Sequence, residues 1–359
     1  MRISKAHTFP YIAQFQQHHM SSLEAKYCYG SKSSNFANSS NFNRAVPSNT
    51  TKHVKTGCDT LINSIPQKMI IKVLDKLILI FQLSIIFALG FAIHGCDSWR
   101  VPTHESLNAM SFNVQIFGVS KMGKPDVVAV LLDIFDRQDV SMMMEIRDAS
   151  EGSFPNFVQA LNEYSQFNYN WTVGDRKGQS SSKEQYGFIW RTDKVKFLQM
   201  YEYPDTDLTF QRPPSVAQFQ SIATGRTFLY IPIHTQPDNT IAEMNGLVDV
   251  YEASSAFYDT ENAIIAGDFN AGCNYVCKTC WSDITLFTDQ RFFWTVSSYA
   301  NTTVAGSQCP YDRVVLAGKQ MTKQVRNAHV FRYDLAWNLP HSLVKDVSDH
   351  YPIEFEIII

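Results

Sequence analysis

Apolar runs of strand length alternate with longer amphipathic segments from residue 106 to the C-terminus, and this alternation limits the folds that the chain can adopt. The runs over 106–114, 139–148 and 262–270 have the length and composition of buried strands. Segment 124–138 repeats apolar residues every three or four positions and predicts a helix, and segment 239–258 predicts a second, long helix. Strands mixed with a few long helices predict an α/β domain in which sheets pack face to face and helices cover them.

The same patterns predict further strands and one more helix. Strands are expected at 226–234, 313–318 and 353–357, and the runs 186–191 and 195–203 are expected to pair around a turn at 192–194. Segment 153–164 predicts a helix with Ser153 as its N-cap and Pro155 in its first turn. No linker-like stretch interrupts this region, so we expect one domain over residues 97–359.

The first 96 residues differ from the rest in composition. Residues 1–68 are rich in Ser, Asn, Gln and His and form a low-complexity leader. In segment 69–96, Lys72 and Lys76 precede an apolar run from Leu77 to Ile93, which predicts a secretory signal peptide. A membrane anchor that is not cleaved and a buried helix are the alternatives. Because a signal peptide starts a protein, we expect translation to begin at Met69 and residues 1–68 to be a mispredicted extension.

Charge is divided unevenly along the chain. Residues 1–96 contain 10 Lys and Arg against 3 Asp and Glu, whereas residues 97–359 contain 21 against 31. The acidic part excludes binding to nucleic acid by loose electrostatic attraction alone. A polyanionic substrate would need a local basic groove or divalent cations to offset the repulsion.

Polar side chains of a restricted kind stand where the predicted strands meet loops. They are carboxylates, amides and imidazoles: Asn113, Glu145, His234, Asp268, Asn270, Asp312, Asp349 and His350. Any one of them could be a turn cap or a surface residue. Together they match a different pattern, because carboxylate and amide oxygens bind Mg²⁺, Mn²⁺ or Ca²⁺ and histidines paired with carboxylates move protons near neutral pH.

Five motifs carry a resemblance to a known family. They are "SFNVQIFG", "EIRD", "IIAGDFNAGCNY", "CPYDRVVLAG" and "SDHYPIEF". In order and spacing they resemble the secreted deoxyribonuclease I family, a branch of the endonuclease/exonuclease/phosphatase superfamily, from about Leu107 to Ile357. The resemblance implies a four-layer αββα sandwich of two packed mixed or antiparallel sheets. It also implies a secreted, monomeric enzyme that hydrolyses DNA to 5′-phosphate products.

The resemblance also implies roles for particular residues. Glu145, Asn113, Asp268, Asn270 and Asp349 match the residues that hold a divalent metal and the phosphate, with Mg²⁺ or Mn²⁺ and also Ca²⁺ expected. His234 and His350 match the two catalytic histidines, while Glu184 and Asp312 match the carboxylates that orient them. A phosphodiesterase or phosphatase acting on a lipid or inositol phosphate is the alternative, and a catalytically weakened binding protein is a third reading.

Contacts with DNA are implied for Arg147 and Arg212, for which a surface salt bridge is the alternative. Two departures from the family predict weaker duplex binding: Gln115 stands where the family has Arg, and Ser182 stands where it has a tyrosine of the minor groove. The small disulfide loop of the vertebrate enzymes is missing from 202–212, which puts calcium stabilisation there in doubt. The actin-contact segment of the family falls on 168–175, a match too loose to predict actin binding.

Cysteines and sequons complete the motifs. The resemblance implies a disulfide between Cys273 and Cys309, while Cys277 and Cys280 form either a redox or metal motif or a second local bridge. Cys96 is left without a predicted partner. Two sequons, at Asn170 and Asn301, predict N-glycosylation if the protein is secreted.

Overall fold

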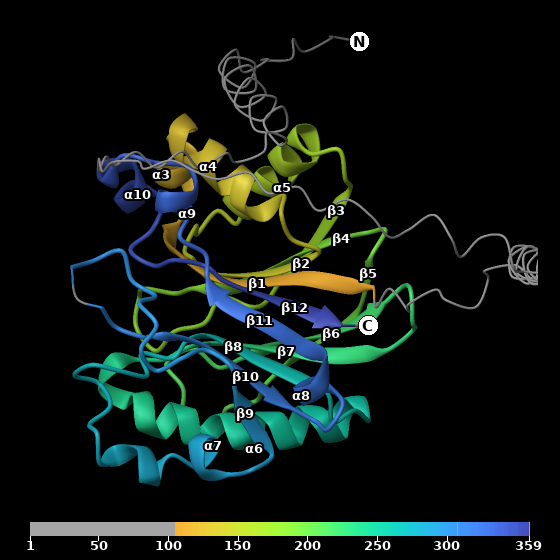
Figure 1. The fold of residues 1–359 in the computed structure, drawn as a ribbon, viewed down its shortest axis with the longest axis vertical. Coiled ribbons are helices and arrows are strands. Elements are labelled where there is room, and N and C mark those ends of the chain that lie inside the picture. Colours follow the sequence, from red (N-terminus) through yellow and green to blue (C-terminus); the bar gives the residue numbers. More distant parts are fainter. Residues whose placement is uncertain (1–104, 307, 359) are drawn as a thin grey trace, which may run out of the picture. The chain divides into compact units, whose positions relative to one another are not determined.

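Two six-stranded sheets form the centre of the computed structural model, which describes residues 105–306 and 308–358 (Figure 1). The predictions for the leader and the signal peptide lie outside these residues. The first sheet has the order β11-β12-β1-β2-β4-β3 and the second the order β5-β6-β7-β8-β10-β9.

The first sheet consists of β1 (Ser106–Phe117), β2 (Val140–Ile146), β3 (Tyr169–Val173), β4 (Gln185–Arg191), β11 (Val325–Val330) and β12 (Ile353–Ile358). The second consists of β5 (Val195–Glu202), β6 (Ser215–Ser221), β7 (Thr227–His234), β8 (Ala263–Asp268), β9 (Phe292–Trp294) and β10 (Asp312–Ala317). The helices are α3 (Val119–Met122), α4 (Pro125–Phe135), α5 (Ser153–Tyr164), α6 (Thr240–Tyr258), α7 (Thr285–Thr288), α8 (Met321–Gln324), α9 (Tyr333–Ala336) and α10 (His341–Val347). Short 3₁₀ turns cover Pro237–Asn239 and Cys280–Asp283.

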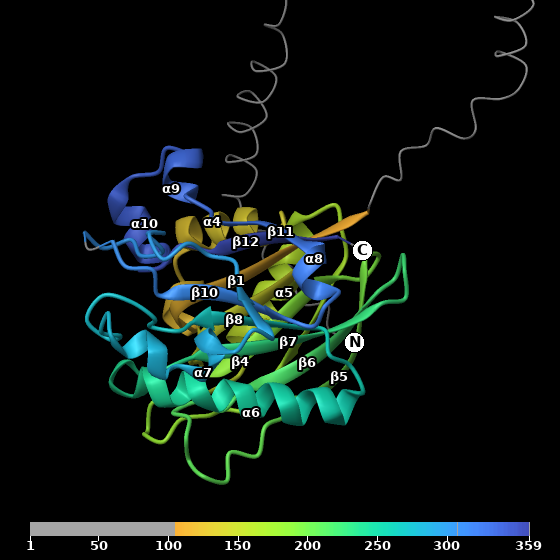
Figure 2. The same ribbon diagram turned by 60° about the horizontal axis from the view of Figure 1, so that its bottom comes forward.

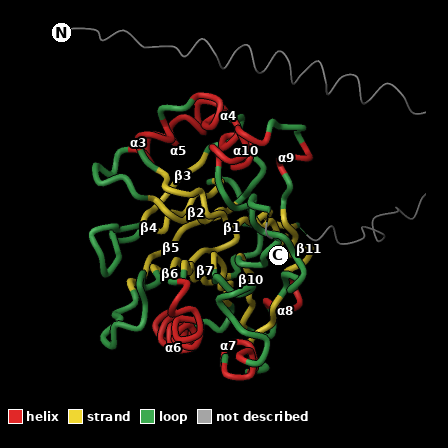
Figure 3. Tube along the Cα trace, turned by 90° about the vertical axis from the view of Figure 1, so that its left-hand side faces the viewer, coloured by secondary structure: helices red, strands yellow, loops and turns green. Residues whose placement is uncertain are grey.

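Three apolar clusters hold the layers together, and Figures 2 and 3 show helices on the outer face of each sheet. The first cluster packs the first sheet against α4, α5 and α10, with Phe112, Leu131 and Phe157 among its members. The second fills the space between the two sheets, and the third packs the second sheet against α6 and α7. The predicted four-layer αββα sandwich is therefore confirmed.

Each sheet contains one parallel pair, β1 with β2 and β7 with β8, while the other pairings are antiparallel. The carboxyl ends of β1 and β2 lie at the same end of the first sheet, and β12 starts at that end because it runs antiparallel to β1. The second sheet repeats this arrangement, since β10 starts at the end of the sheet where β7 and β8 finish. Polar residues that are far apart in sequence therefore meet at strand ends.

Two local predictions were wrong. Strands β4 and β5 do not pair, because the turn at 192–194 carries the chain from the first sheet to the second, where β5 pairs with β6. Ser153 is not the N-cap of α5, since that position belongs to Gly152. Instead, the Asp148 carboxylate accepts hydrogen bonds from the Ser153 N–H at 2.8 Å and hydroxyl at 2.7 Å, so the cap comes from outside the helix.

Sequence patterns missed the strands β3, β9 and β11, whose exposed positions break the alternation, and the buried strand β6, whose sequence alternates polar and apolar residues without a long apolar run. Along 105–306 and 308–358, no helix has both the length and the apolar character that a membrane span requires.

Candidate active site

Three site residues of the second sheet are neighbours by strand register. His234 stands opposite Asp268 in the parallel pair, and Asp312 stands opposite Asp268 in the antiparallel pair. Gly267 makes the approach possible: its φ is +150°, and a Cβ there would lie 1.9 Å from the carbonyl oxygen of Ile233. The sequence Gly267-Asp268 at the end of β8 therefore places the Asp268 carboxylate between His234 of β7 and Asp312 of β10.

His234 is held by a carboxylate from the other sheet. Its Nδ1 lies 2.9 Å from Glu184 Oε2, and its Nε2 lies 3.7 Å from Asp268 Oδ2. Glu184 is 7% exposed, so its carboxylate is buried against His234 and is not a solvated loop side chain. The backbone N–H of His234 donates to the Tyr186 hydroxyl at 3.0 Å, which fixes the end of β7.

His350 repeats this arrangement from the first sheet. Its Nδ1 lies 2.7 Å from Asp312 Oδ2, and its Nε2 lies 3.5 Å from Asp268 Oδ2. The Ser348 hydroxyl donates to the Asn113 carbonyl at 2.6 Å and accepts from the His350 N–H at 3.0 Å. Each imidazole thus directs its Nδ1 to a carboxylate of its own, Glu184 or Asp312, and both direct Nε2 to Asp268.

Asn113 and Glu145 come from the ends of β1 and β2, where the regular ladder breaks. The register shifts after Asn113, and Gln115, Ile116 and Glu145 have positive φ angles of 46°, 50° and 59°. Asn113 Nδ2 donates to Asp268 Oδ2 at 3.3 Å, and Glu145 Oε2 accepts from the Ile116 N–H at 2.8 Å. Such sparsely populated backbone conformations cluster at functional sites.

Asn270 and Asp349 complete the predicted set from two loops. Asn270, with φ of 49°, donates its backbone N–H to Asp268 Oδ1 at 2.9 Å and its side-chain amide to the Thr235 carbonyl at 3.0 Å. Asp349 Oδ1 lies 4.0 Å from His350 Nε2, and its side chain is 51% exposed. Asp268 therefore contacts Asn113, Asn270 and both histidines, whereas Glu145 bonds to the Ile116 N–H and Asp349 lies at the solvent side of His350.

The residues present suit a divalent cation. Among the described residues, one ligand atom each from Asp268, Asp312 and His350 lies within 4.8 Å of the others. Asp312 is 1% exposed, yet its Oδ1 has no hydrogen-bond partner. A buried carboxylate oxygen without a partner is costly unless a cation or a water satisfies it. The surrounding donors are carboxylate and amide oxygens, which hard cations prefer.

The charges of the site shift the pKa values of both histidines. Burial by itself lowers the pKa of His350, but Asp312 and Asp268 outweigh it and raise that pKa to about 10. Burial also opposes protonation of His234, whose pKa is nevertheless raised by the hydrogen bond to Glu184. The pKa of Glu184 is lowered, because His234 and Arg212 offset its burial.

The two predicted arginines differ in their surroundings. Arg212 donates to the carbonyls of His234 at 3.0 Å and Thr235 at 3.1 Å, and its Nε lies 3.5 Å from Glu184 Oε2. Its guanidinium is therefore part of the frame around His234 and is only 12% exposed. Arg147 is partly exposed and hydrogen bonds to the exposed Ser182.

Both disulfides are formed. Cys273 is bonded to Cys309 across a separation of 36 residues, and Cys277 is bonded to Cys280, so these cysteines do not form a metal site. The first bridge ties the loop after Asn270 to the start of β10, which carries Asp312. The pairing implied by the resemblance thus lies directly beside the site.

Sequence reasoning missed two buried charges behind the site. Lys121 donates to the carbonyls of Val114 and Val347, each at 2.6 Å, and burial lowers its pKa to about 8. Glu243 in α6 is fully buried and accepts from the N–H groups of Gln211 and Gln236. The only signal was a charged residue within a helix turn, a pattern that usually indicates solvent exposure.

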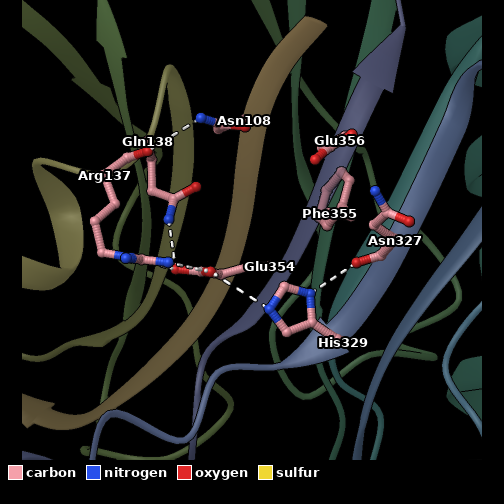
Figure 4. Close-up of a pocket in the computed structure, with 8 residues that line it drawn as sticks. All are labelled: Asn108, Arg137, Gln138, Asn327, His329, Glu354, Phe355 and Glu356. Carbon is pink, nitrogen blue, oxygen red and sulfur yellow. Dashed lines mark hydrogen bonds and ion pairs between the residues drawn. The ribbon is translucent and has the colours of Figure 1, made fainter. Parts of the chain in front are cut away.

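The pocket drawn in Figure 4 lies elsewhere, around the half of β1 that is remote from Asn113, and has a volume of about 370 Å³. Arg137 binds Glu354 through two hydrogen bonds of 3.0 and 2.9 Å, and Gln138 donates to the same carboxylate at 2.7 Å. Glu354 is thus already neutralised and hydrogen bonded, so this pocket does not offer the chemistry of the site around Asp268.

Comparisons with known proteins agree with this geometry. The model of the "Endonuclease/Exonuclease/phosphatase family" matches residues 110–350. Deoxyribonuclease gamma of Mus musculus is 38% identical over 263 residues, which cover 70% of this chain and 84% of that protein. Deoxyribonuclease-1 of Homo sapiens is 35% identical over 257 residues, which cover 69% and 91%. The catalytic domain of human Nocturnin shares the fold with a TM-score of 0.50 at 12% identity, covering 70% and 93%.

The chain belongs to the endonuclease/exonuclease/phosphatase family. Within it, the similarity to deoxyribonuclease gamma and deoxyribonuclease-1 extends over most of the chain, which confirms the predicted resemblance to the deoxyribonuclease I branch.

Proposed function

We propose that residues 97–359 form a secreted, divalent-metal-dependent endonuclease that hydrolyses DNA and leaves 5′-phosphate ends. One observation carries the proposal: two histidine–carboxylate pairs, each with one member from each sheet, direct their histidine Nε2 atoms to Asp268 from 3.7 and 3.5 Å. A phosphodiester placed beside Asp268 would have one imidazole on each side. The deoxyribonucleases among the relatives support DNA as the substrate.

The two pairs divide the proton transfers. Glu184 and Asp312 hold the Nδ1–H of His234 and His350, which leaves each Nε2 free to exchange a proton. One histidine takes a proton from the attacking water as its oxygen bonds to phosphorus. The other gives a proton to the 3′-oxygen as the P–O3′ bond breaks, so the phosphate stays on the 5′ side and the protons balance.

Glu145, Asn113, Asp268, Asn270 and Asp349 are the residues that we propose hold Mg²⁺ or Mn²⁺ and the phosphate. When bound, the cation supplies positive charge against the phosphate oxygens. The Asn113 amide and the Asn270 backbone N–H donate to Asp268 and fix its carboxylate, while the Asn270 amide donates to the Thr235 carbonyl at the end of β7. Ca²⁺ is proposed as a second, stabilising ion.

Arg147 is proposed to contact DNA at the minor groove, because its side chain is partly exposed and hydrogen bonds to the exposed Ser182. Arg212 contributes mainly by positioning His234, given its two bonds to backbone carbonyls. The protein is proposed to act as a monomer outside the cell, which its two disulfides support. No actin contact is proposed.

Plasmid nicking by the purified chain tests the proposal. We expect nicking with Mg²⁺ and Ca²⁺, none with EDTA, and a loss of at least about 10²-fold in His234→Ala and in His350→Ala. His329→Ala is the matched control, because that imidazole is 56% exposed and remote from Asp268. A folded chain without nicking activity would move the proposal to lipid or inositol phosphodiesters, and nicking that survives both mutations would refute the assigned site.

A further inference from the structure

The two glycosylation sequons are not used by the proposed site, and they lie in different surroundings. Asn170-Trp171-Thr172 is in β3, an edge strand of the first sheet. Asn301-Thr302-Thr303 is in the loop that pairs with His350 through Thr303. Asn301 Oδ1 accepts from the N–H and hydroxyl of Thr303 at 3.3 and 3.2 Å, and Asn170 Oδ1 accepts from the Trp171 N–H at 2.8 Å, so the two sequons differ in their position in the fold and not in this local bonding.

Strand alternation directs the first sequon toward the space between the sheets. Tyr169 belongs to the cluster on the helix side of the first sheet, and Trp171 packs on Phe154 of α5 with ring centroids 5.7 Å apart. Asn170 and Thr172 therefore point to the opposite face. Asn170 is exposed there and stands opposite Trp190 in the register of β3 and β4.

A lateral groove of about 490 Å³ opens at this position, lined by Asn170, Trp171, Thr172, Trp190, Thr192, Val195, Lys196, Phe197 and Ile222. It lies between β3 and β5, the edge strands of the two sheets, which are on the same side in Figure 1. Trp190 and Phe197 stack with centroids 5.3 Å apart, and Ile222 is 52% exposed. The sequon asparagine and threonine are thus part of the wall of an apolar groove.

We propose that Asn170 carries an N-linked glycan whose first sugars lie in this lateral groove. The C–H face of a pyranose ring suits an apolar wall with aromatic side chains, while its hydroxyls stay in water. A glycan at this position also covers the free edge of β3, and exposed edge strands otherwise pair with other chains. The inference rests on the proposed entry into the secretory pathway, because only chains that enter it meet the glycosylation machinery.

The glycan leaves the reaction undisturbed. Asn170 pairs with Trp190, and Trp190 pairs with Val140 at the start of β2, whereas Glu145 is near the end of β2. The lateral groove is therefore at the end of the first sheet that is opposite to the site around Asp268. Variants of Asn170 are expected to keep the nicking activity of the parent chain.

Mass spectrometry of the full chain secreted from a eukaryotic host tests the inference. Peptide N-glycosidase should convert Asn170 to Asp in its tryptic peptide, and Asn170→Gln and Thr172→Val should each remove one glycan from the intact mass. Thr172→Ser keeps the sequon and is the matched control, and Asn301→Gln is the control at the other site. Asn170→Gln should also form larger species in light scattering at high concentration.

The outcomes separate the inference from the proposed function. A secreted chain whose Asn170 peptide is found without sugar overturns the inference and leaves secretion in place. A chain that stays inside the cell with no sugar on either sequon overturns the proposed secretion and the inference together. Nicking by that same chain would still support the nuclease.

Discussion

His234 and His350 share one arrangement although they stand on different sheets. Each turns Nδ1 to a buried carboxylate at 2.9 or 2.7 Å and Nε2 to Asp268. The carboxylate fixes the tautomer of the imidazole, which is what proton transfer at Nε2 requires. The motifs indicated the histidines, but only the folded chain brings Glu184 and Asp312 to them from 50 and 38 residues away.

Glu184→Gln tests the role of the first carboxylate. The amide can hold its oxygen toward Nδ1 but removes the negative charge, so the imidazolium that forms during the reaction loses its stabilising partner. We expect kcat to fall by about 10²-fold with little change in KM. Kinetics of plasmid nicking measure this, with Glu202→Gln as a control carboxylate. A change confined to KM would contradict the positioning role.

Gln115→Arg tests the expectation that an arginine at this position would strengthen binding to duplex DNA. Gln115 follows the register break after Asn113 and is partly exposed. An arginine there should add about one phosphate contact, which steepens the dependence of log K on log salt concentration by about 0.9. Binding of duplex DNA to a His350→Ala background at several salt concentrations gives the slope. An unchanged slope in Gln115→Arg, equal to that in Gln115→Ala, would show that this position does not reach the phosphates.

At the scale of elements, the start of α6 supports the end of β7. Glu243 Oε1 accepts from the Gln236 N–H at 3.0 Å and the Gln211 N–H at 3.3 Å, while its Oε2 has no partner. Gln236 follows His234 by two residues, and Gln211 precedes Arg212. One buried carboxyl group therefore holds the two segments that carry the frame of His234.

The pH dependence of stability tests Glu243. Burial raises its pKa to about 7, although Arg212 and His234 oppose the shift. Because the folded state keeps the proton to a higher pH than the unfolded state does, this group weakens folding as the pH rises from about 4.5 to 7, by on the order of 2–3 kcal/mol. Glu243→Gln cannot ionise, so denaturant unfolding should show its advantage over the parent growing across this window. A constant difference would refute the shift.

The sequence predicted a helix or strand correctly where a single pattern of apolar residues covered the whole segment. Long segments such as α6 and the buried run of β8 followed their patterns, because tertiary contacts and local preference agree there. The prediction of a hairpin around the turn at 192–194 was wrong, since a short polar turn suits a hairpin as well as a crossing between two sheets. The prediction that Ser153 is the N-cap of α5 was wrong because Asp148, which lies outside the helix, supplies the hydrogen-bond acceptor.

The Cys273–Cys309 bridge belongs to the same scale, because it fastens the loop after β8 to β10. It closes a loop of 36 residues, so replacing both cysteines by serine should cost about 3–4 kcal/mol of stability. Denaturant unfolding measures the loss, and Cys277→Ser with Cys280→Ser is the control, since it opens a ring of separation 3. Equal effects of the two double variants would show that loop length does not set the stabilisation.

For the whole molecule, the packing of two sheets gathers negative charge at one edge. Asp268, Asp312 and His350 come from three segments and meet only because the strand ends of both sheets face one another. Sequence supplied the residue types and their order, whereas the sharing of Asp268 by both histidines depends on register and sheet packing that no local pattern encodes. A divalent cation at this edge would stabilise the folded state as well as assist the reaction.

Thermal unfolding with and without metal tests that linkage independently of activity. Saturating Mg²⁺ at about 100 times its dissociation constant should stabilise the chain by about 2.7 kcal/mol and raise Tm by roughly 5 °C or more. In Asp268→Asn the metal-dependent rise should be lost, because the carboxylate that both histidines share is removed. Asp249→Asn on the exposed face of α6 is the control and should keep the full rise. A full rise in Asp268→Asn would place the cation elsewhere and separate metal binding from the histidine pairs.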